Sequence, residues 1–104
     1  MDNVVDVGSI GVRIVAQWLS RQGFRTRMNF VLSSTTDIEA VDQNTKMLIQ
    51  VRTAVLPAEP APLTAKEVAL FQSRAWDKNF EPWEAMIQLD SSNAIIGQIM
   101  WRKL

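Results

Sequence analysis

Carboxylate, amide and guanidinium groups lie close together near the middle of the chain, and such groups build sites for metal ions or phosphates. The residues are Asp37, Glu39, Gln50 and Arg52. Carboxylate and amide oxygens are ligands for Mg²⁺, whereas a guanidinium holds a phosphate through paired hydrogen bonds. A purely structural alternative is an ion pair between Asp37 and Arg52, with Gln50 hydrogen-bonded beside them and Glu39 on the solvated surface.

Two runs of alternating polar and apolar residues, 37–41 and 47–54, predict the strands that would carry these groups. The intervening Asp42-Gln43-Asn44-Thr45 is typical of a tight turn, so a hairpin is expected. With Gln43 and Asn44 as its loop, Asp37 faces Gln50 and Arg52 lies one step diagonal. The polar face would then hold Asp37, Glu39, Leu48, Gln50 and Arg52, while Ile38, Ala40, Met47, Ile49 and Val51 enter the core.

Composition excludes several other chemistries. The chain has no Cys and no His, which rules out disulfides, thiolate or imidazole metal sites and the usual serine or cysteine triads. Its 104 residues, 47% of them hydrophobic, are enough for one core, so residues 1–104 are expected to form a single domain. An acidic beginning and the lack of a long apolar run favour a cytoplasmic location, with no membrane contact.

Further elements are predicted on both sides of the hairpin. A helix is expected over 9–22 with Gly23 as its C-cap, followed by a strand over 24–32. After a proline-rich connector at 56–62, Thr64 and Glu67 make a capping box that starts a second helix. Runs 83–89 and 95–101 predict two closing strands around a turn at 90–93. The expected fold is α/β, in the order α-β-β-β-α-β-β, with a mixed central sheet flanked by helices.

This order and several short motifs resemble the PD-(D/E)xK nuclease superfamily, the restriction-endonuclease-like fold. Within it, the likeness is to archaeal Holliday-junction resolvases and their small bacterial relatives. The motifs are Gly8-Ser9-Ile10-Gly11 with Gly23-Phe24, then Asp37-Ile38-Glu39-Ala40, and Ile49-Gln50-Val51-Arg52-Thr53. The resemblance covers almost the whole chain and implies a Mg²⁺-dependent DNA endonuclease whose site includes a strand Asp, a Glu-x-Lys pair and a helix Glu.

The chain departs from that pattern at the positions that matter for cutting. Asp37 matches the metal-binding Asp, but Gln50 replaces the Glu, Arg52 replaces the Lys and Val12 stands where the helix Glu is found. Loss of a carboxylate removes negative charge from a Mg²⁺ site, and Arg cannot accept a proton. We therefore expect a degenerate site of Asp37, Gln50 and Arg52 without a metal or other cofactor. The alternative is an active enzyme that holds Mg²⁺ through Asp37 and Glu39, with Gln50 as a neutral ligand.

The arginines and tryptophans bear on partners. Arg13, Arg21, Arg25 and Arg27 fall in an acid-free stretch, although eleven basic residues balance eleven acidic ones overall. Weak, salt-sensitive DNA binding through Arg13, Arg25, Arg27 and Arg52 is expected, unless these residues are only solvated surface. The four tryptophans and a broadly apolar first helix favour a homodimer, whose contact would use apolar residues of that helix or of the closing strands, including Trp101. Three functions remain: a non-cleaving nucleic-acid-binding or interaction module, an active endonuclease, and an assembly subunit without DNA contact.

Overall fold

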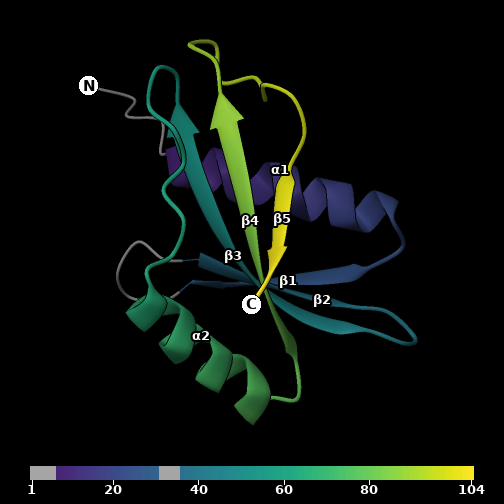
Figure 1. Cartoon of the computed structure of the whole chain (residues 1–104). Coiled ribbons are helices and arrows are strands. Elements are labelled where there is room, and N and C mark those ends of the chain that lie inside the picture. Colours follow the sequence, from purple (N-terminus) through teal and green to yellow (C-terminus); the bar gives the residue numbers. More distant parts are fainter. Residues whose placement is uncertain (1–6, 31–35) are drawn as a thin grey trace.

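Five strands in the order β1-β2-β3-β4-β5 form one sheet between two helices (Figure 1). This computed structural model describes residues 7–30 and 36–104. The elements are α1 (Val7–Arg21), β1 (Arg25–Phe30), β2 (Thr36–Val41), β3 (Lys46–Val55), α2 (Ala65–Asp77), β4 (Glu81–Leu89) and β5 (Met100–Lys103). The predicted order and the α/β class are confirmed, and the end of the strand expected over 24–32 lies outside the described residues.

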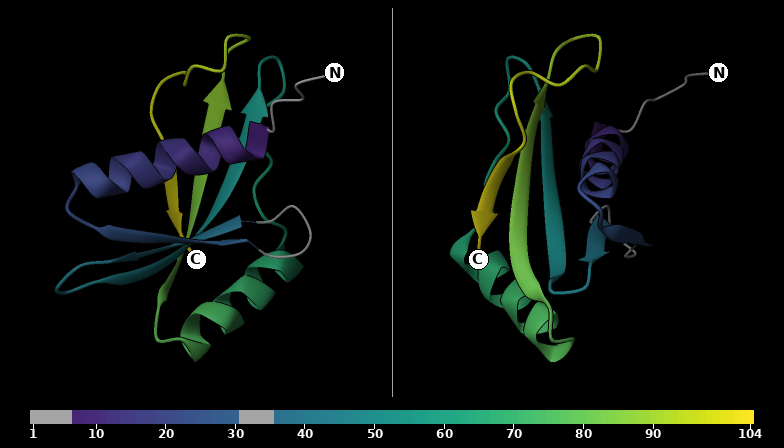
Figure 2. Two further views of the ribbon diagram at one scale, coloured as in Figure 1. Left: turned by 180° about the vertical axis from the view of Figure 1, so that it is seen from behind. Right: turned by 90° about the vertical axis from the view of Figure 1, so that its right-hand side faces the viewer.

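The sheet is mixed. β1, β2 and β3 follow one another in antiparallel pairs, β4 runs parallel to β3, and β5 pairs antiparallel with β4. A parallel pair needs a crossover, which α2 supplies. The two helices lie on opposite sides of the sheet (Figure 2). We call these sides the α1 face and the α2 face.

The main core fills the α1 face. Val12, Val15, Ala16 and Leu19 recur at the spacing of one helical stripe and are buried against Ile38, Ala40, Ile49, Ala85, Ile87 and Leu89. Gly11 lets the helix approach β3 closely, since a Cβ there would lie 1.8 Å from Thr53 Oγ1. The sheet thus covers most of the apolar stripe of α1 from which we expected contact with a second subunit.

Both helix caps agree with the sequence. Gly23 adopts a φ of 94°, the Phe24 N–H donates to the Leu19 carbonyl and the Gly23 N–H donates to the Ser20 carbonyl, which is a Schellman ending. At the start of α2, the Glu67 N–H donates to Thr64 Oγ1 while the Thr64 N–H donates to the Glu67 carboxylate. The predicted capping box is therefore confirmed.

The last predicted strand is wrong in its position. We expected a strand over 95–101, but β5 begins at Met100 and Ile95 makes only an isolated bridge to Leu89. Between that bridge and the Met86–Met100 pair, residues 87–88 on β4 face residues 96–99, so two extra residues leave the sheet. Gly97, with a φ of 70°, interrupts the extended backbone there. The turn at 90–93 is formed, and the Asp90 N–H donates to the Ala94 carbonyl.

Candidate functional site

A row of buried polar side chains crosses the α2 face. Asp37 on β2 pairs with Gln50 on β3, as the hairpin predicts, and Gln50 pairs in turn with Glu84 on β4. Residues paired directly across strands share a face, so the three side chains stand next to one another. Asp37 is 3% exposed, Gln50 5% and Glu84 0%. We call Asp37, Gln50 and Glu84 the polar row.

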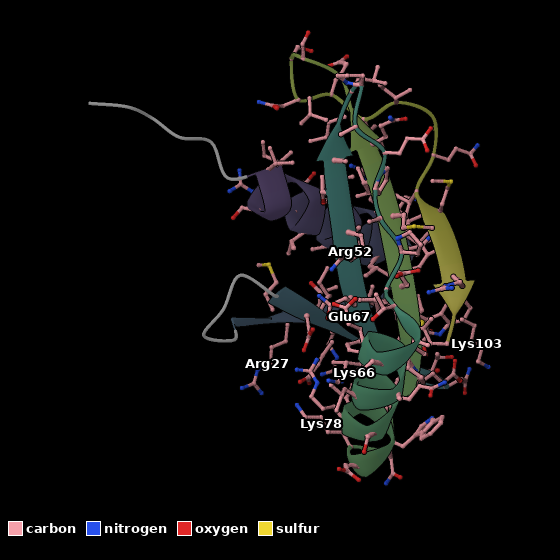
Figure 3. All side chains as sticks on the ribbon, turned by 60° about the vertical axis from the view of Figure 1, so that its left-hand side comes forward. Arg27, Arg52, Lys66, Glu67, Lys78 and Lys103 are labelled. Atoms are coloured by element: carbon pink, nitrogen blue, oxygen red, sulfur yellow. The ribbon has the colours of Figure 1, made fainter. Side chains whose placement is uncertain are left out.

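Helix α2 provides cations for the carboxylates of β2. Arg74 forms a hydrogen-bonded ion pair with Asp37, and Lys78 Nζ lies 3.1 Å from Glu39 Oε2. Arg74 and Lys78 are four residues apart on a helix, a rise of about 6 Å. Asp37 and Glu39 are two residues apart on a strand, about 6.7 Å. The two spacings match closely enough for both pairs to form. Lys78 lies at the C-terminal end of α2 (Figure 3).

Asp37 remains an unusual carboxylate despite this pairing. Burial raises the pKa of Asp37 above its ordinary value of 3.8, and the neighbouring Arg74 guanidinium opposes part of that rise. Asp37 Oδ1 is buried and has no hydrogen-bond partner among the described residues. A buried oxygen without a donor favours the protonated form. Arg74 thus balances the charge of Asp37, but one of the two carboxylate oxygens lacks a hydrogen-bond donor among the described residues.

Arg52 lies on the α2 face but takes no part in the Asp37 ion pair. Its Nε donates to the Ala61 carbonyl at 3.0 Å, which ties β3 to the connector before α2. The ion pair that the sequence suggested between Asp37 and Arg52 is therefore replaced by the pair with Arg74. The hairpin register was correct, but the sequence did not show that the crossover helix would lay its own arginine over Asp37.

Val12 does not join the polar row. It is 6% exposed and belongs to the core between α1 and the sheet, whereas Asp37 and Gln50 face α2. The resemblance had placed position 12 beside these residues as the site of a missing Glu. In the structure the sheet separates them, because α1 packs on the opposite face.

Glu84 is a member of the row that the sequence analysis missed. Its Oε2 accepts a hydrogen bond from the Leu63 N–H at 2.6 Å, and Arg102 Nε lies 2.9 Å from its Oε1. Trp83, Ala85, Ile87 and Leu89 alternate with Glu84, Met86 and Gln88, which marks Glu84 as facing away from the main core. Its place beside Gln50 depends on the β3–β4 register across a long crossover, which no local pattern specifies.

The acidic side chains of this site are balanced by nearby cations. Asp37, Glu39 and Glu84 are each paired with a cation of their own, and Gln50 is neutral, so the cluster has no surplus of negative charge. A hard divalent cation is recruited by uncompensated carboxylates. Within residues 7–30 and 36–104, no three acidic side chains converge in a way that could hold a metal. The arrangement joins α2 and the connector to one face of the sheet and links β4 to its neighbour β5.

The arginines expected to bind DNA do not form one patch. Arg25 and Arg27 pair with Val41 and Glu39, which places them at the β1 edge of the α2 face with Arg52 further along the sheet. Arg13, like Arg21, is exposed on α1, across the sheet from them. The expected patch is thus divided between the two faces, because neighbouring segments of the chain pack on opposite sides.

Comparison with known proteins does not place the chain in a family. No model of a known protein family matches the chain, and no curated protein matches its sequence. In the part of the chain that the structure describes, neither helix has the length and apolar character needed to cross a bilayer.

Proposed function

We propose that this chain is a restriction-endonuclease-like domain that binds nucleic acid without cutting it. The order α-β-β-β-α-β-β, the mixed sheet with helices on both sides and the pairing of Asp37 with position 50 support the fold assignment. These are the features on which the resemblance rested, and the described residues are compatible with each of them.

The single observation that carries the non-cleaving assignment is the double ion pair between α2 and β2. Arg74 and Lys78 neutralise Asp37 and Glu39, the two carboxylates that an active site would need for Mg²⁺. Gln50 between Asp37 and Glu84 adds an oxygen but no charge. Loss of one well-placed electrostatic group commonly reduces catalytic rates by about 10²–10³-fold, and here the whole metal site is compensated by cations.

Charge distribution supports a nucleic-acid partner. Residues 7–30 contain four arginines and no acidic residue, in a chain that is neutral overall. The four are exposed. Arg is well suited to phosphate because its planar guanidinium donates two parallel hydrogen bonds. With so few cations on any one face, binding is expected to be weak and to depend on two to four phosphate contacts at most.

The test is binding and cleavage measured on the same samples. Labelled four-way junction, duplex and single-stranded DNA are titrated with the protein at several salt concentrations in Mg²⁺ or Mn²⁺, and the recovered DNA is sized. We expect salt-sensitive binding, with a log–log slope between about −1 and −4, and intact DNA. Cleavage that Asp37→Ala abolishes contradicts the non-cleaving assignment and favours the active endonuclease. The absence of salt-sensitive binding to all three forms favours an assembly subunit.

A further inference from the structure

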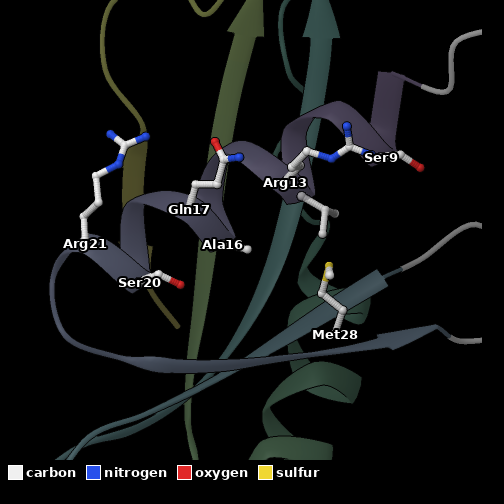
Figure 4. Close-up of a pocket in the computed structure, with 8 residues that line it drawn as sticks. Ser9, Arg13, Ala16, Gln17, Ser20, Arg21 and Met28 are labelled. Atoms are coloured by element: carbon white, nitrogen blue, oxygen red, sulfur yellow. The ribbon is translucent and has the colours of Figure 1, made fainter.

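A groove runs along α1 where the helix meets β1. It has a volume of about 640 Å³ and its floor is apolar, formed by Val12, Ala16 and Met28. Its polar lining comes from one side of the helix: Ser9, Arg13, Gln17, Ser20 and Arg21. Figure 4 shows Arg13, Gln17 and Arg21 following one another along the helix, with Met28 below. We call this the α1 groove.

The α1 groove is suited to an extended anion. Arg13 and Arg21 are eight residues apart, which separates them by about 12 Å along the helix axis. Among the described residues, no Asp or Glu lines the groove. Polar groups from Ser9, Gln17 and Ser20 lie between or beside the two arginines and can donate further hydrogen bonds. Two cations at this separation match a chain of phosphates better than a single compact anion.

A second groove lies on the other side of Gln17 and Arg21. It has a volume of about 600 Å³ and is walled by Trp18 and Trp101 together with Ile14, Ile95 and Ile99. The two indole rings are 5.5 Å apart between centroids, and Trp18 remains 38% exposed. The described residues that line this groove include no acidic side chain either. We call it the Trp groove. Its outer wall is the segment that leaves the sheet at Gly97, so the sequence, which predicted a strand there, gave no sign of it.

We infer that α1 is a binding site for single-stranded nucleic acid, with backbone phosphates held by Arg13 and Arg21 in the α1 groove and an unpaired base in the Trp groove. This inference rests on the proposed function and names the nucleic acid and the surface that it uses. Gln17 and Arg21 line both grooves, so a phosphate and its neighbouring base can reach the two grooves together.

Stacking of a base on the tryptophan rings favours a single strand over a duplex as the ligand. Aromatic side chains that present a ring beside a basic groove bind bases of any sequence, because every base has a π-face. In a duplex those faces are covered by neighbouring bases, so a duplex could use the arginines but not the Trp groove. A second copy of this chain is a poorer occupant, because a two-fold contact centred here would bring arginines of both copies together without acidic residues to pair with them.

The experiment measures anisotropy of a labelled oligothymidylate and of a duplex of the same length, with tryptophan fluorescence recorded in parallel. The intact chain is expected to bind the single strand more tightly and to show quenched fluorescence. Arg13→Gln with Arg21→Gln removes two phosphate contacts, so the log–log salt slope should become shallower by about 1.4. Lys46→Gln with Lys66→Gln removes the same charge from exposed positions away from the grooves and should change the slope little.

The base contact is tested at Trp18. Trp18→Leu should weaken single-strand binding by about ten-fold and leave duplex binding unchanged, whereas Trp18→Phe keeps a ring and should retain most of the affinity. Thermal unfolding of both variants shows whether a loss of affinity reflects misfolding. If Trp18→Leu is misfolded, the affinity of Trp18→Phe for the single strand tests the base contact.

Several results would overturn the inference. Loss confined to Arg25→Gln with Arg27→Gln moves the site to β1 and leaves the proposed function intact. Tighter binding of the duplex, or no effect of either Trp18 variant, removes the single-strand assignment. A Trp18→Leu variant that turns a dimer into a monomer makes the second copy the occupant. Absence of binding to every nucleic acid defeats the proposed function itself.

Discussion

At the scale of single residues, Asp37 is the group whose surroundings decide what the α2 face can do. It is buried, lacks a donor to Oδ1 within the described residues, and depends on Arg74 for compensation of its charge. A buried carboxylate with one cation already bound is a poor recruiter of a second, divalent one. Gln50, paired beside it, is neutral and adds no charge that could attract a metal.

Removal of Arg74 should destabilise the fold in a pH-dependent way. Burial already raises the pKa of Asp37, and without Arg74 that pKa should rise further. The unfolded chain then ionises first as pH increases, so stability falls between the ordinary value of 3.8 and the higher folded value. We expect Arg74→Met to cost about 1–2 kcal/mol at pH 7, reduced from a buried pair because Arg74 is partly exposed.

Urea unfolding at pH 7 and pH 5 checks this expectation. The difference between Arg74→Met and the wild type should shrink at the lower pH, where a larger fraction of Asp37 in the variant is protonated. Lys78→Met is the matched control, because its pair with Glu39 is more exposed and should contribute less than about 1 kcal/mol. An Arg74→Met deficit that is the same at both pH values speaks against a buried, uncompensated Asp37.

At the scale of elements, α2 positions the cations, and its start is fixed by the capping box. The Thr64 N–H donates to the Glu67 carboxylate, and this bond holds the pKa of Glu67 below its ordinary value of 4.5. An ionised carboxylate near the helix N-terminus also interacts favourably with the helix dipole. Displacement of this first turn would shift Arg74 and Lys78 away from β2.

Acid should therefore weaken the wild type through Glu67. A lowered folded pKa means that the stabilisation is present above 4.5 and is lost as pH falls through the folded value. Glu67→Gln should be less stable than the wild type at pH 6, and the gap should close below pH 4.5. Thr64→Ala removes the cap at both values and should cost about 1 kcal/mol. Equal urea midpoints for Glu67→Gln and wild type at pH 6 would show that the charge of Glu67 contributes nothing to stability.

Local signals explain which elements could be predicted. The capping box, the Gly23 ending and the β2–β3 hairpin are each encoded within a few residues, and the structure confirms all three. Glu84 beside Gln50 and Arg74 over Asp37 depend instead on a parallel pairing and on the path of a helix between distant strands. The run 95–101 has the composition of a strand, but the backbone at Gly97 overrides it.

At the scale of the whole molecule, the two edges of the sheet and several exposed apolar side chains are available for contact with a partner. Sheet strands β1 and β5 are both edges. β5 has only four residues, of which Met100 is 51% exposed, and Ile96 in the segment before it is 37% exposed. An edge strand leaves backbone N–H and C=O groups unpaired, and exposed apolar side chains beside them favour contact with another chain. The apolar stripe of α1 is mostly covered by the sheet, so this closing strand is the better candidate for an interface.

The homodimer remains a prediction, and we now expect it through β5. Light scattering at high micromolar concentration should give twice the 11.8 kDa mass of the chain. Met100→Lys should lower the apparent mass, because it places a charge on the edge strand, while Met28→Lys at the α1 groove should not. A monomeric mass for the wild type at that concentration ends the idea.

The most direct test of the whole account is a calorimetric titration of the wild-type protein with Mn²⁺. We predict no binding heat, because Arg74 and Lys78 already hold the carboxylates that a metal would need. Gln50→Glu combined with Arg74→Gln serves as the positive control, since it frees Asp37 and places a third carboxylate between it and Glu84. Stoichiometric Mn²⁺ binding by the wild type that Asp37→Asn removes would contradict the account and reassign the α2 face as a metal site.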